Sequence, residues 1–369
     1  MRIAHLSVGD VFSAKWTASQ ALDGHDVHLI TQEAPLEPPG PLVTCHRLRF
    51  PRPFGYCLNA WSLKRLLQRI RPDLLHVHYA TGFGTLGRLS GFRPCVLSAW
   101  GSDVLHAPSQ SRILRVMVNQ NLKHYDCVCV TSRVMERAIR RLVPSLNSIV
   151  TPIGVDTRVF APRDRSADAH LTVGTVKTMD PIYGIDYLLQ AFAAVKKRLS
   201  DSHDDRTGDL RLSIVGGGPS LEEYRKLAGN LGIADVTTFH GQLPNAMVPN
   251  LLSGMDIFVA LSRSESFGVA VVEASSCGIP VVASDVGGLP EVVKDKETGF
   301  VVPPGDIEKA ADALERLICD RELRLNLGER GRAFVQQNFE WARCHEMMYG
   351  VYREAQARSG RTKIQIQVG

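Results

Sequence analysis

The most informative part of the sequence is residues 257–292, which read IFVALSRSESFGVAVVEASSCGIPVVASDVGGLPEV. The run at 257–261 and the run PVVASD, which begins at Pro280, are short apolar segments of the kind that form buried strands. The residues between them predict a loop followed by a short helix that begins near Phe267 and Gly268. Two buried strands joined through a helix indicate a βαβ unit and therefore a parallel sheet.

The same alternation of short apolar runs and longer amphipathic segments extends along the whole chain of 369 residues, a length typical of two domains. In the second half, further strands are predicted at 171–176, 210–215 and 236–241. In the first half they are predicted at Ile3–Ser7, Val27–Thr31, Leu74–His78, Cys95–Ala99 and Cys127–Thr131. The sequence therefore predicts an α/β protein with two doubly wound lobes, each built on a parallel sheet.

Three parts of the chain are expected from these patterns. Pro162 and the polar stretch APRDRSADA (161–169) interrupt the alternation, so we predict a first domain over 1–160 and a second over 161–338. The residues after Gln336 predict one long terminal helix, counted here as 339–360. A second polar stretch, 201–210, is predicted to be a loop.

The composition excludes several classes of protein. Apolar residues make up 44% and charged residues 22% of the chain, which is typical of a soluble globular protein. An uncharged apolar run of about 18 residues, as a membrane span needs, does not occur in the sequence. His5 and Asp10 interrupt the N-terminal apolar segment before a signal peptide could form. We therefore expect a cytoplasmic protein, either free or at the inner face of the cell membrane.

The positive charge is concentrated in the first half of the chain. Residues 1–160 hold 19 Lys and Arg against 10 Asp and Glu, whereas the remainder holds 24 against 28. The segment 47–71 contains seven basic residues, no acidic residue, and apolar residues at helical spacing. It predicts either a surface helix that buries its apolar stripe, or an amphipathic patch that meets an anionic membrane or attracts an anionic substrate. Nucleic acid is a less favoured partner, because aromatic residues are sparse there and no recognition motif occurs.

Loops that follow strands carry the chemistry in sheets of this kind. Gly216–Gly218 follow one strand, and they indicate either a phosphate-binding turn or a turn that is glycine-rich for steric reasons alone. Glu273 lies on an otherwise apolar helix, where a carboxylate is difficult to bury without a partner. The hydroxyls of a ribose would satisfy it, and the alternative is an ordinary exposed glutamate. The N-terminus of that helix, near Gly268, would suit a diphosphate.

The run 262–293 resembles the E-x7-E signature of retaining glycosyltransferases of the GT-B class, family-4 type. Supporting matches are GHDVHLIT (24–31), DLLHVHYA (73–80), WGSDV (100–104), IVGGGP (214–219) and ETGFVVPPGD (297–306). The resemblance covers roughly residues 1–350. It implies two Rossmann-like lobes that face each other across a cleft, with acceptor bound by the first and nucleotide-sugar by the second. It also implies a terminal helix that crosses back to the first lobe, no required metal, and no cofactor.

The resemblance assigns roles to residues that match the family pattern. Glu273 would hold the ribose hydroxyls, and Glu265 would lie near the donor sugar. The remaining assignments are the turn that meets sugar and phosphate (Phe267, Gly268), the phosphate-side turn (Gly217, Gly218) and the acceptor side (His78, Asp103).

The sequence departs from the family pattern at three positions. Thr175 and Tyr183 stand where many members carry the Arg and Lys that neutralise the leaving diphosphate. Lys177 is the first candidate to replace them and Arg263 the second, although either could be a solvated cation. Trp100 stands where a histidine is frequent, and it would either shape the acceptor site or pack in the core. The residues Asp10, Phe12 and Lys15 are expected to face the cleft without assigned chemistry.

The resemblance implies transfer of a sugar, with retention of configuration, from a nucleotide-diphosphate donor to a hydroxyl of a glycan or lipid-linked acceptor. A UDP-sugar is the favoured donor and a GDP-sugar the alternative, and cell-envelope polysaccharide or glycolipid synthesis is the expected setting. Two other classes stay open. One is a non-catalytic nucleotide-sugar-binding protein, and the other is an epimerase or phosphorylase of GT-B shape.

Overall fold

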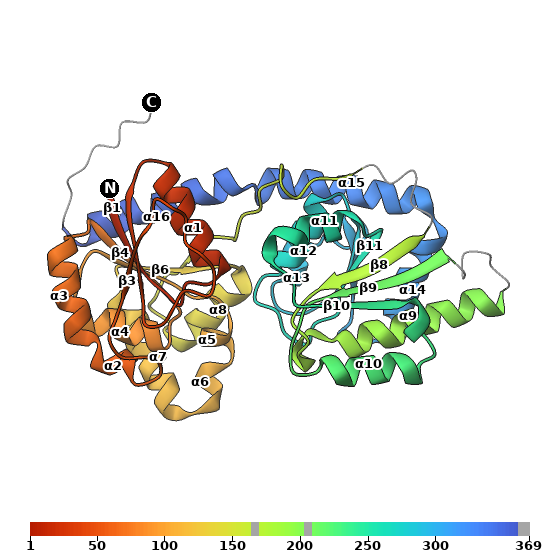
Figure 1. The fold of residues 1–369 in the computed structure, drawn as a ribbon, viewed down its shortest axis with the longest axis horizontal. Coiled ribbons are helices and arrows are strands. Elements are labelled where there is room, and N and C mark those ends of the chain that lie inside the picture. The colour runs from red at the N-terminus through yellow and green to blue at the C-terminus, as the bar shows by residue number, and fades with distance from the viewer. Residues whose placement is uncertain (164–169, 203–208, 361–369) are drawn as a thin grey trace. The chain divides into compact units, whose positions relative to one another are not determined.

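The computed structural model describes residues 1–163, 170–202 and 209–360 (Figure 1). The chain forms two compact units. Of the described residues, the first unit comprises Met1–Pro152 together with those from His345 to Gly360, and the second comprises those between Ile153 and Cys344. Each unit holds one parallel sheet with helices packed on it, so the predicted α/β fold with two doubly wound lobes is confirmed.

The sheet of the first unit has the strand order β3-β2-β1-β4-β5-β6-β7, with every pair parallel. Its strands are β1 (Arg2–Leu6), β2 (Asp26–Thr31), β3 (Thr44–Arg47), β4 (Leu74–His78), β5 (Cys95–Ser98), β6 (Cys127–Val130) and β7 (Ile149–Val150). All five strands predicted for this half are present. The sequence did not indicate β3, which is a mostly exposed edge strand, or β7, which has only two residues.

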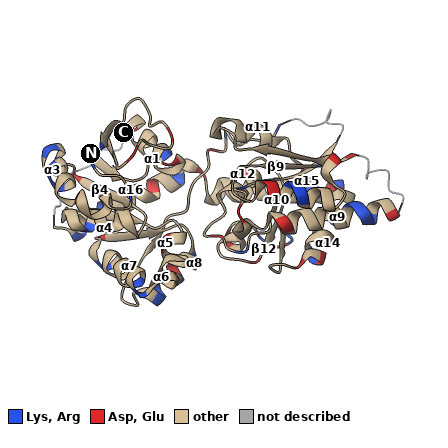
Figure 2. Ribbon diagram, turned by 60° about the horizontal axis from the view of Figure 1, so that its bottom comes forward, with Lys and Arg blue, Asp and Glu red and all other residues tan. Residues whose placement is uncertain are grey.

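In the described part of the chain, eight helices and most of a ninth surround this sheet. They are α1 (Val11–Leu22), α2 (Gly55–Leu58), α3 (Ala60–Ile70), α4 (Gly82–Ser90), α5 (Ser102–Leu105), α6 (Ala107–Gln110), α7 (Arg112–His124), α8 (Arg133–Leu142) and α16 (Trp341–Arg358). The apolar stripe of α3 is buried through Leu63, Leu67 and Ile70, because their spacing places them on one face of the helix. Figure 2 shows lysines and arginines along this helix.

The sheet of the second unit has the order β10-β9-β8-β11-β12-β13 and is also parallel throughout. Its strands are β8 (Leu171–Val176), β9 (Leu210–Val215), β10 (Thr237–Gly241), β11 (Ile257–Ala260), β12 (Val281–Ser284) and β13 (Gly299–Val302). Its helices are η1 (Pro181–Tyr183), α9 (Ile185–Asp201), α10 (Leu221–Asn230), η3 (Ala234–Val236), η4 (Asn245–Met247), α11 (Val248–Ser253), α12 (Val269–Ser276), α13 (Leu289–Val292), α14 (Ile307–Cys319) and α15 (Arg321–Asn338). The short helix predicted near Phe267 and Gly268 is α12.

The boundaries between the units differ from the predicted 160/161 and 338/339. Val155 forms a β-bridge with Glu340, and the Ser276 hydroxyl donates to the Phe160 carbonyl at 2.6 Å. These contacts attach residues 153–160 to the second unit. The predicted single terminal helix is two helices, α15 and α16, which are interrupted at Phe339 and Glu340. Residues 164–169, 203–208 and 361–369, where the polar stretches and the end of the chain fall, lie outside the described part.

Both sheets reverse their strand order beside their first strand, between β1 and β4 in one unit and between β8 and β11 in the other. Helices that leave such neighbouring strands go to opposite faces, which opens a crevice at the carboxyl ends of the two strands. The loops after β1, β4, β8 and β11 are therefore the places to look for a site. Within the described ranges, every helix is too short or too polar to cross a membrane.

Candidate active site

Lys177 and Glu265 meet at the strand-order reversal of the second unit. Lys177 directly follows β8, and Glu265 lies in the loop after β11. The Lys177 ammonium forms an ion pair with a Glu265 carboxylate oxygen, and each side chain is only 11% exposed. The same ammonium lies 4.8 Å from the centre of the Tyr183 ring. This cation therefore lies next to Tyr183, one of the two positions at which the family cations are missing.

The glycine turn after β9 holds the loop that carries Lys177. The Lys177 amide donates to the Val215 carbonyl, and the Met179 amide donates to the Gly217 carbonyl, both at 2.9 Å. A Cβ on Gly216 would lie 1.9 Å from the Lys177 carbonyl oxygen, and one on Gly218 would lie 2.5 Å from that of Met179. Both glycines have φ in the region that side chains avoid, +137° and +153°. Close backbone packing therefore accounts for the glycines at 216 and 218.

A second glycine turn, after β12, holds the loop that carries Glu265. The Gly288 amide donates to the Glu265 carbonyl at 3.0 Å, and a Cβ on Gly287 would lie 1.7 Å from the same oxygen. Ser284 supports this contact, because its hydroxyl donates to the Ser262 carbonyl at 2.6 Å. The backbone at Glu265 is thus fixed by the neighbouring turn.

Gly268 and Phe267 precede α12, and Glu273 lies within it. Gly268 precedes the helix with φ of +101°, and no side chain caps the helix N-terminus. Phe267 is buried and packs edge-on against Phe339, with ring centres 5.5 Å apart. Glu273 is half-buried on a helix whose neighbouring positions Val272 and Ala274 are buried.

Arg263, the second candidate cation, is engaged elsewhere. Its guanidinium binds both carboxylate oxygens of Asp186, at 2.9 and 2.6 Å, and also donates to the Pro181 carbonyl. It lies 4.0 Å from the centre of the Tyr187 ring. The hydrogen bonds with Asp186 raise the pKa of Arg263 above its ordinary value. Arg263 therefore fastens η1 to α9, whereas the Lys177 ammonium pairs with Glu265.

In the first unit, Asp103 holds two loops together. Its carboxylate accepts hydrogen bonds from the amides of Ala80 at 2.7 Å, Gly101 at 2.9 Å and Trp100 at 3.1 Å. Burial raises the pKa of this carboxyl, and the three backbone hydrogen bonds oppose that change. Asp103 therefore acts on the site through the loops after β4 and β5, which it positions.

His78, at the end of β4, belongs to a buried network of histidines. Its Nε2 lies 3.0 Å from His5 Nδ1, and its ring stacks on that of His76 with centres 4.3 Å apart. Among the described residues, His5, His76 and His78 form the group whose nitrogens lie close enough to hold a metal, within 4.8 Å of one another. Both nitrogens of His5 and both of His76 already have hydrogen-bond partners, among them Gln20 and Tyr352. The described contacts are therefore those of a hydrogen-bond network.

Tyr79 is a feature that the sequence did not indicate, although it lies within the quoted stretch 73–80. Its φ is +73°, which is rare for a bulky residue and is typical of functional loops. Its hydroxyl donates to an Asp10 carboxylate oxygen at 3.1 Å. This bond joins the loops after β1 and β4, the two strands between which the order reverses. Backbone strain has no signal in a single sequence.

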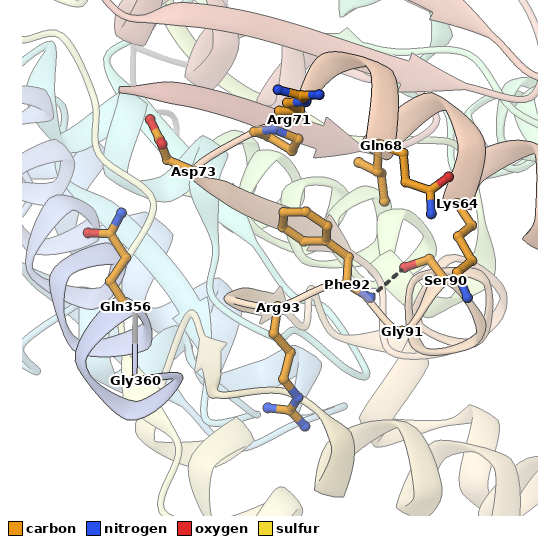
Figure 3. A pocket seen from close by; sticks show the side chains of 12 residues that line it. Lys64, Gln68, Arg71, Asp73, Ser90, Gly91, Phe92, Arg93, Gln356 and Gly360 are labelled. Atoms are coloured by element: carbon orange, nitrogen blue, oxygen red, sulfur yellow. Dashed lines mark hydrogen bonds between the residues drawn. The ribbon is translucent and has the colours of Figure 1, made fainter. Parts of the chain in front are cut away.

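A hollow of about 1010 Å³ lies at the amino ends of the strands of the first sheet (Figure 3). Its wall includes Lys64 on α3, Arg71 directly after that helix, Asp73 before β4, and Phe92 and Arg93 before β5. It therefore lies at the amino ends of these strands, away from the loops that carry the candidate site. Two of its cations, Lys64 and Arg71, come from the basic segment 47–71.

Comparisons with known proteins identify the family of this chain. Residues 161–334 match the family model described as glycosyl transferases group 1, and residues 2–132 match the model described as glycosyl transferase 4-like. The D-inositol 3-phosphate glycosyltransferase of Saccharomonospora viridis is 32% identical over 330 residues, which are 80% of this chain and 73% of the relative. The chain belongs to the group 1 glycosyltransferases of the family-4 type.

Two further similarities extend over nearly the whole length. The N-acetyl-alpha-D-glucosaminyl L-malate synthase of Bacillus anthracis is 29% identical over 343 residues, 86% of each chain. The structure of sucrose-phosphate synthase from Thermosynechococcus elongatus superposes with a TM-score of 0.82 at 25% identity, covering 97% of this chain and 99% of that one. The GT-B fold and the resemblance found in the sequence are thus confirmed, and the general activity of this glycosyltransferase is glycosyl transfer.

We predict that Gly287→Ala destabilises the protein by about 3 kcal/mol or more, because the new Cβ collides with the Glu265 carbonyl in addition to the cost of the positive φ. Gly241→Ala is the matched control, since φ is also positive there (+69°) but the space around it is open. It should cost only about 1–2 kcal/mol. Unfolding in urea measures both, and equal losses would contradict the contact.

Proposed function

We propose that the strand-order reversal in the second unit binds the diphosphate of a nucleotide-sugar and that the enzyme transfers the sugar with retention of configuration. The observation that carries the proposal is the ion pair of Lys177 with Glu265 at that point. A UDP-sugar is the favoured donor, and a GDP-sugar is the alternative. Lys177 supplies the positive charge that the family Arg and Lys would supply at positions 175 and 183, without a metal.

Charge stabilisation is the main contribution expected from this site. Negative charge develops on the diphosphate as it leaves, and a fixed cation in a shielded site offsets it. Before the donor binds, Glu265 keeps the Lys177 ammonium in place and balances its charge. The uncapped N-terminus of α12 provides amides for the phosphates and sugar at Phe267 and Gly268, and Glu273 on the same helix binds the ribose hydroxyls.

The configuration of the sugar is retained because the acceptor hydroxyl attacks the same face of the sugar from which the nucleotide departs. Glu265 is paired with Lys177, so it is poorly disposed to act as a covalent nucleophile. A phosphate oxygen of the departing nucleotide takes the proton of the acceptor hydroxyl, while the protein positions the reactants. The first unit holds the acceptor near His78, in loops that Asp103 positions.

The acceptor in this proposal is a glycan or a lipid-linked hydroxyl compound used in envelope polysaccharide or glycolipid synthesis. The excess of basic residues in 1–160 supports an anionic acceptor or membrane. Three large apolar side chains on α2, α3 and the residue before them are exposed: Phe54 at 77%, Leu58 at 57% and Trp61 at 63%. Arg65 stacks on the Trp61 ring at 3.7 Å. Aromatic and aliphatic groups among arginines and lysines suit the interface of an anionic membrane, where the protein would act at the cytoplasmic face.

One observation keeps the non-catalytic alternative open. Thr175 is buried and Tyr183 is aromatic, so neither can neutralise a phosphate. A nucleotide-sugar-binding protein without turnover, or an epimerase, would tolerate this loss. Product analysis with and without an acceptor separates both from a transferase.

Glu273→Ala should weaken nucleotide binding at least tenfold, or by ~1.4 kcal/mol, because the ribose loses its carboxylate partner. Calorimetric titration of UDP, GDP and ADP without added metal measures this and identifies the base. Glu297→Ala, at an exposed turn of the same unit, is the control and should leave affinity unchanged. Unchanged affinity in Glu273→Ala would remove the ribose role.

Lys177→Met should lower kcat roughly 10²- to 10³-fold, as expected when one well-placed charge donor is lost from the transition state. Arg263→Met removes a cation of similar length that is held by Asp186, so it should destabilise the fold while kcat stays within a few-fold of wild type. Steady-state kinetics with the donor found by calorimetry compare the two variants. The reverse order of effects would assign the phosphate role to Arg263.

Trp61→Ala should reduce binding to vesicles of phosphatidylglycerol and phosphatidylcholine by roughly tenfold, because an exposed aromatic ring is lost from the membrane-facing patch. Ile113→Ala on α7, which is 81% exposed in the same unit, is the control and should bind like wild type. Vesicle sedimentation at low and high salt measures both. Equal binding to vesicles of phosphatidylcholine alone would argue against an anionic membrane partner.

A further inference from the structure

Two ring nitrogens at the carboxyl edge of the first sheet have no hydrogen-bond partner among the described residues. They are Nδ1 of His78, a side chain that is 1% exposed, and Nε1 of Trp100. Both atoms are shielded from water. Buried polar atoms are nearly always paired in native proteins, and an unpaired one is destabilising. Among the unpaired buried atoms of the described residues, these two lie on neighbouring, stacked rings.

The two rings belong to a stack that leads from the interior of the sheet toward the start of α1. The His78 and Trp100 ring centres are 5.7 Å apart at an interplanar angle of 12°, and the Trp100 and Phe12 centres are 5.4 Å apart at 17°. Trp100 and Phe12 are half-buried, so the stack becomes accessible at this end. It lies at the reversal between β1 and β4, where sheets of this type bind ligands.

The hydrogen bonds that link His78 to His5 and Gln20 determine whether His78 Nδ1 is a donor or an acceptor. Gln20 Nε2 donates to the Tyr352 hydroxyl at 2.9 Å, so Gln20 Oε1 accepts from His5 Nε2 at 2.8 Å. With the amide in this orientation, His5 Nε2 carries the proton and His5 Nδ1 must accept from His78 Nε2 at 3.0 Å. Burial lowers the pKa of both His5 and His78 to about 3, so both rings are neutral. His78 Nδ1 is therefore an unprotonated acceptor.

We propose that His78 Nδ1 and Trp100 Nε1 recognise hydroxyl groups of a substrate sugar or cyclitol, with His78 accepting a hydrogen bond from one hydroxyl and Trp100 donating one. This inference rests on the proposed function and names the chemistry by which the first unit selects its substrate. In this proposal Trp100, which stands where the family frequently has a histidine, determines specificity for the substrate hydroxyl.

The pairing of one acceptor with one donor favours hydroxyls over anions. A carboxylate or sulfate can accept from Trp100 Nε1, but neither has a proton to donate to His78 Nδ1 at neutral pH. A hydroxyl does both. The flat ring of Phe12, at the accessible end of the stack, also suits the apolar face of a sugar ring. The hydroxyl could belong to the acceptor or to the donor sugar, and kinetics distinguish the two sources.

The first test does not need activity. In the full chain labelled with ¹⁵N in tryptophan and histidine, the Trp100 indole signal is identified among the four tryptophans by its loss in Trp100→Phe. At neutral pH, His78 Nδ1 should be unprotonated and Nε2 protonated. Molar glycerol and near-saturated myo-inositol should shift the Trp100 indole signal, whereas sulfate and acetate should leave it in place. A protonated Nδ1, a shift with sulfate or acetate alone, or no shift with either polyol would overturn the proposal.

The second test uses the transfer reaction. Trp100→Phe keeps the ring stack and removes only the N–H, so it should raise the KM of the substrate that supplies the hydroxyl roughly 3- to 10-fold, the range for one neutral hydrogen bond. A rise in the acceptor KM assigns the hydroxyl to the acceptor, and a rise in the donor KM assigns it to the donor sugar. Unchanged values for both would overturn the proposal. Ile113→Val, on an exposed face of α7 in the same unit, is the control and should leave both KM values unchanged.

The two tests separate this inference from the proposed function. If calorimetry finds no nucleotide bound, the proposed function fails. The Trp100 response to polyols is measured without nucleotide, so it still tests the hydroxyl-recognition pair. If nucleotide binds and turnover occurs but Trp100 does not respond, only the hydroxyl-recognition pair is wrong.

Discussion

The reversal of strand order beside β8 is the constraint on which the proposed chemistry depends. It places the loops after β8 and β11 at one edge of the sheet, and the Lys177–Glu265 ion pair joins them there. Two glycine turns make this possible, because side chains at 216 or 287 would collide with the carbonyls of Lys177 and Glu265. The backbone thus holds the shielded Lys177–Glu265 pair at the carboxyl ends of these strands, where we propose that the diphosphate binds.

The two units use different physical means at equivalent places in their sheets. The second unit has a charged pair, which suits an anionic leaving group. The first unit has neutral rings, since burial lowers the pKa of His5 and His78 far below physiological pH. Neutral donors and acceptors are suited to hydroxyls. This division corresponds to a reaction in which a phosphate departs and a hydroxyl attacks.

Local patterns in the sequence predicted most of the strands, the start of α12 and the position of Glu273 within it. Those features depend on periodicity and on glycine, which neighbouring residues determine. The pairing of Arg263 with Asp186 and the loops held by Asp103 were not predictable, because the partners are far apart in the chain or are backbone amides. For the same reason the sequence could rank Lys177 before Arg263 as the replacement cation but could not show what either side chain contacts. The edge strand β3 was missed because its exposed, polar residues lack the apolar run of a central strand.

Hydrogen exchange measured by mass spectrometry, with and without saturating UDP or GDP, tests the central claim most directly. The account predicts that nucleotide protects amides in the loops at 177–184, 216–220, 262–270 and 285–289, all at the carboxyl edge of the second sheet. Gly241 and the exposed turn at Glu297 should exchange unchanged. Protection confined to the basic hollow around Lys64, Arg71 and Arg93, or absent from the loops after β8 and β11, would contradict the assignment of the donor site.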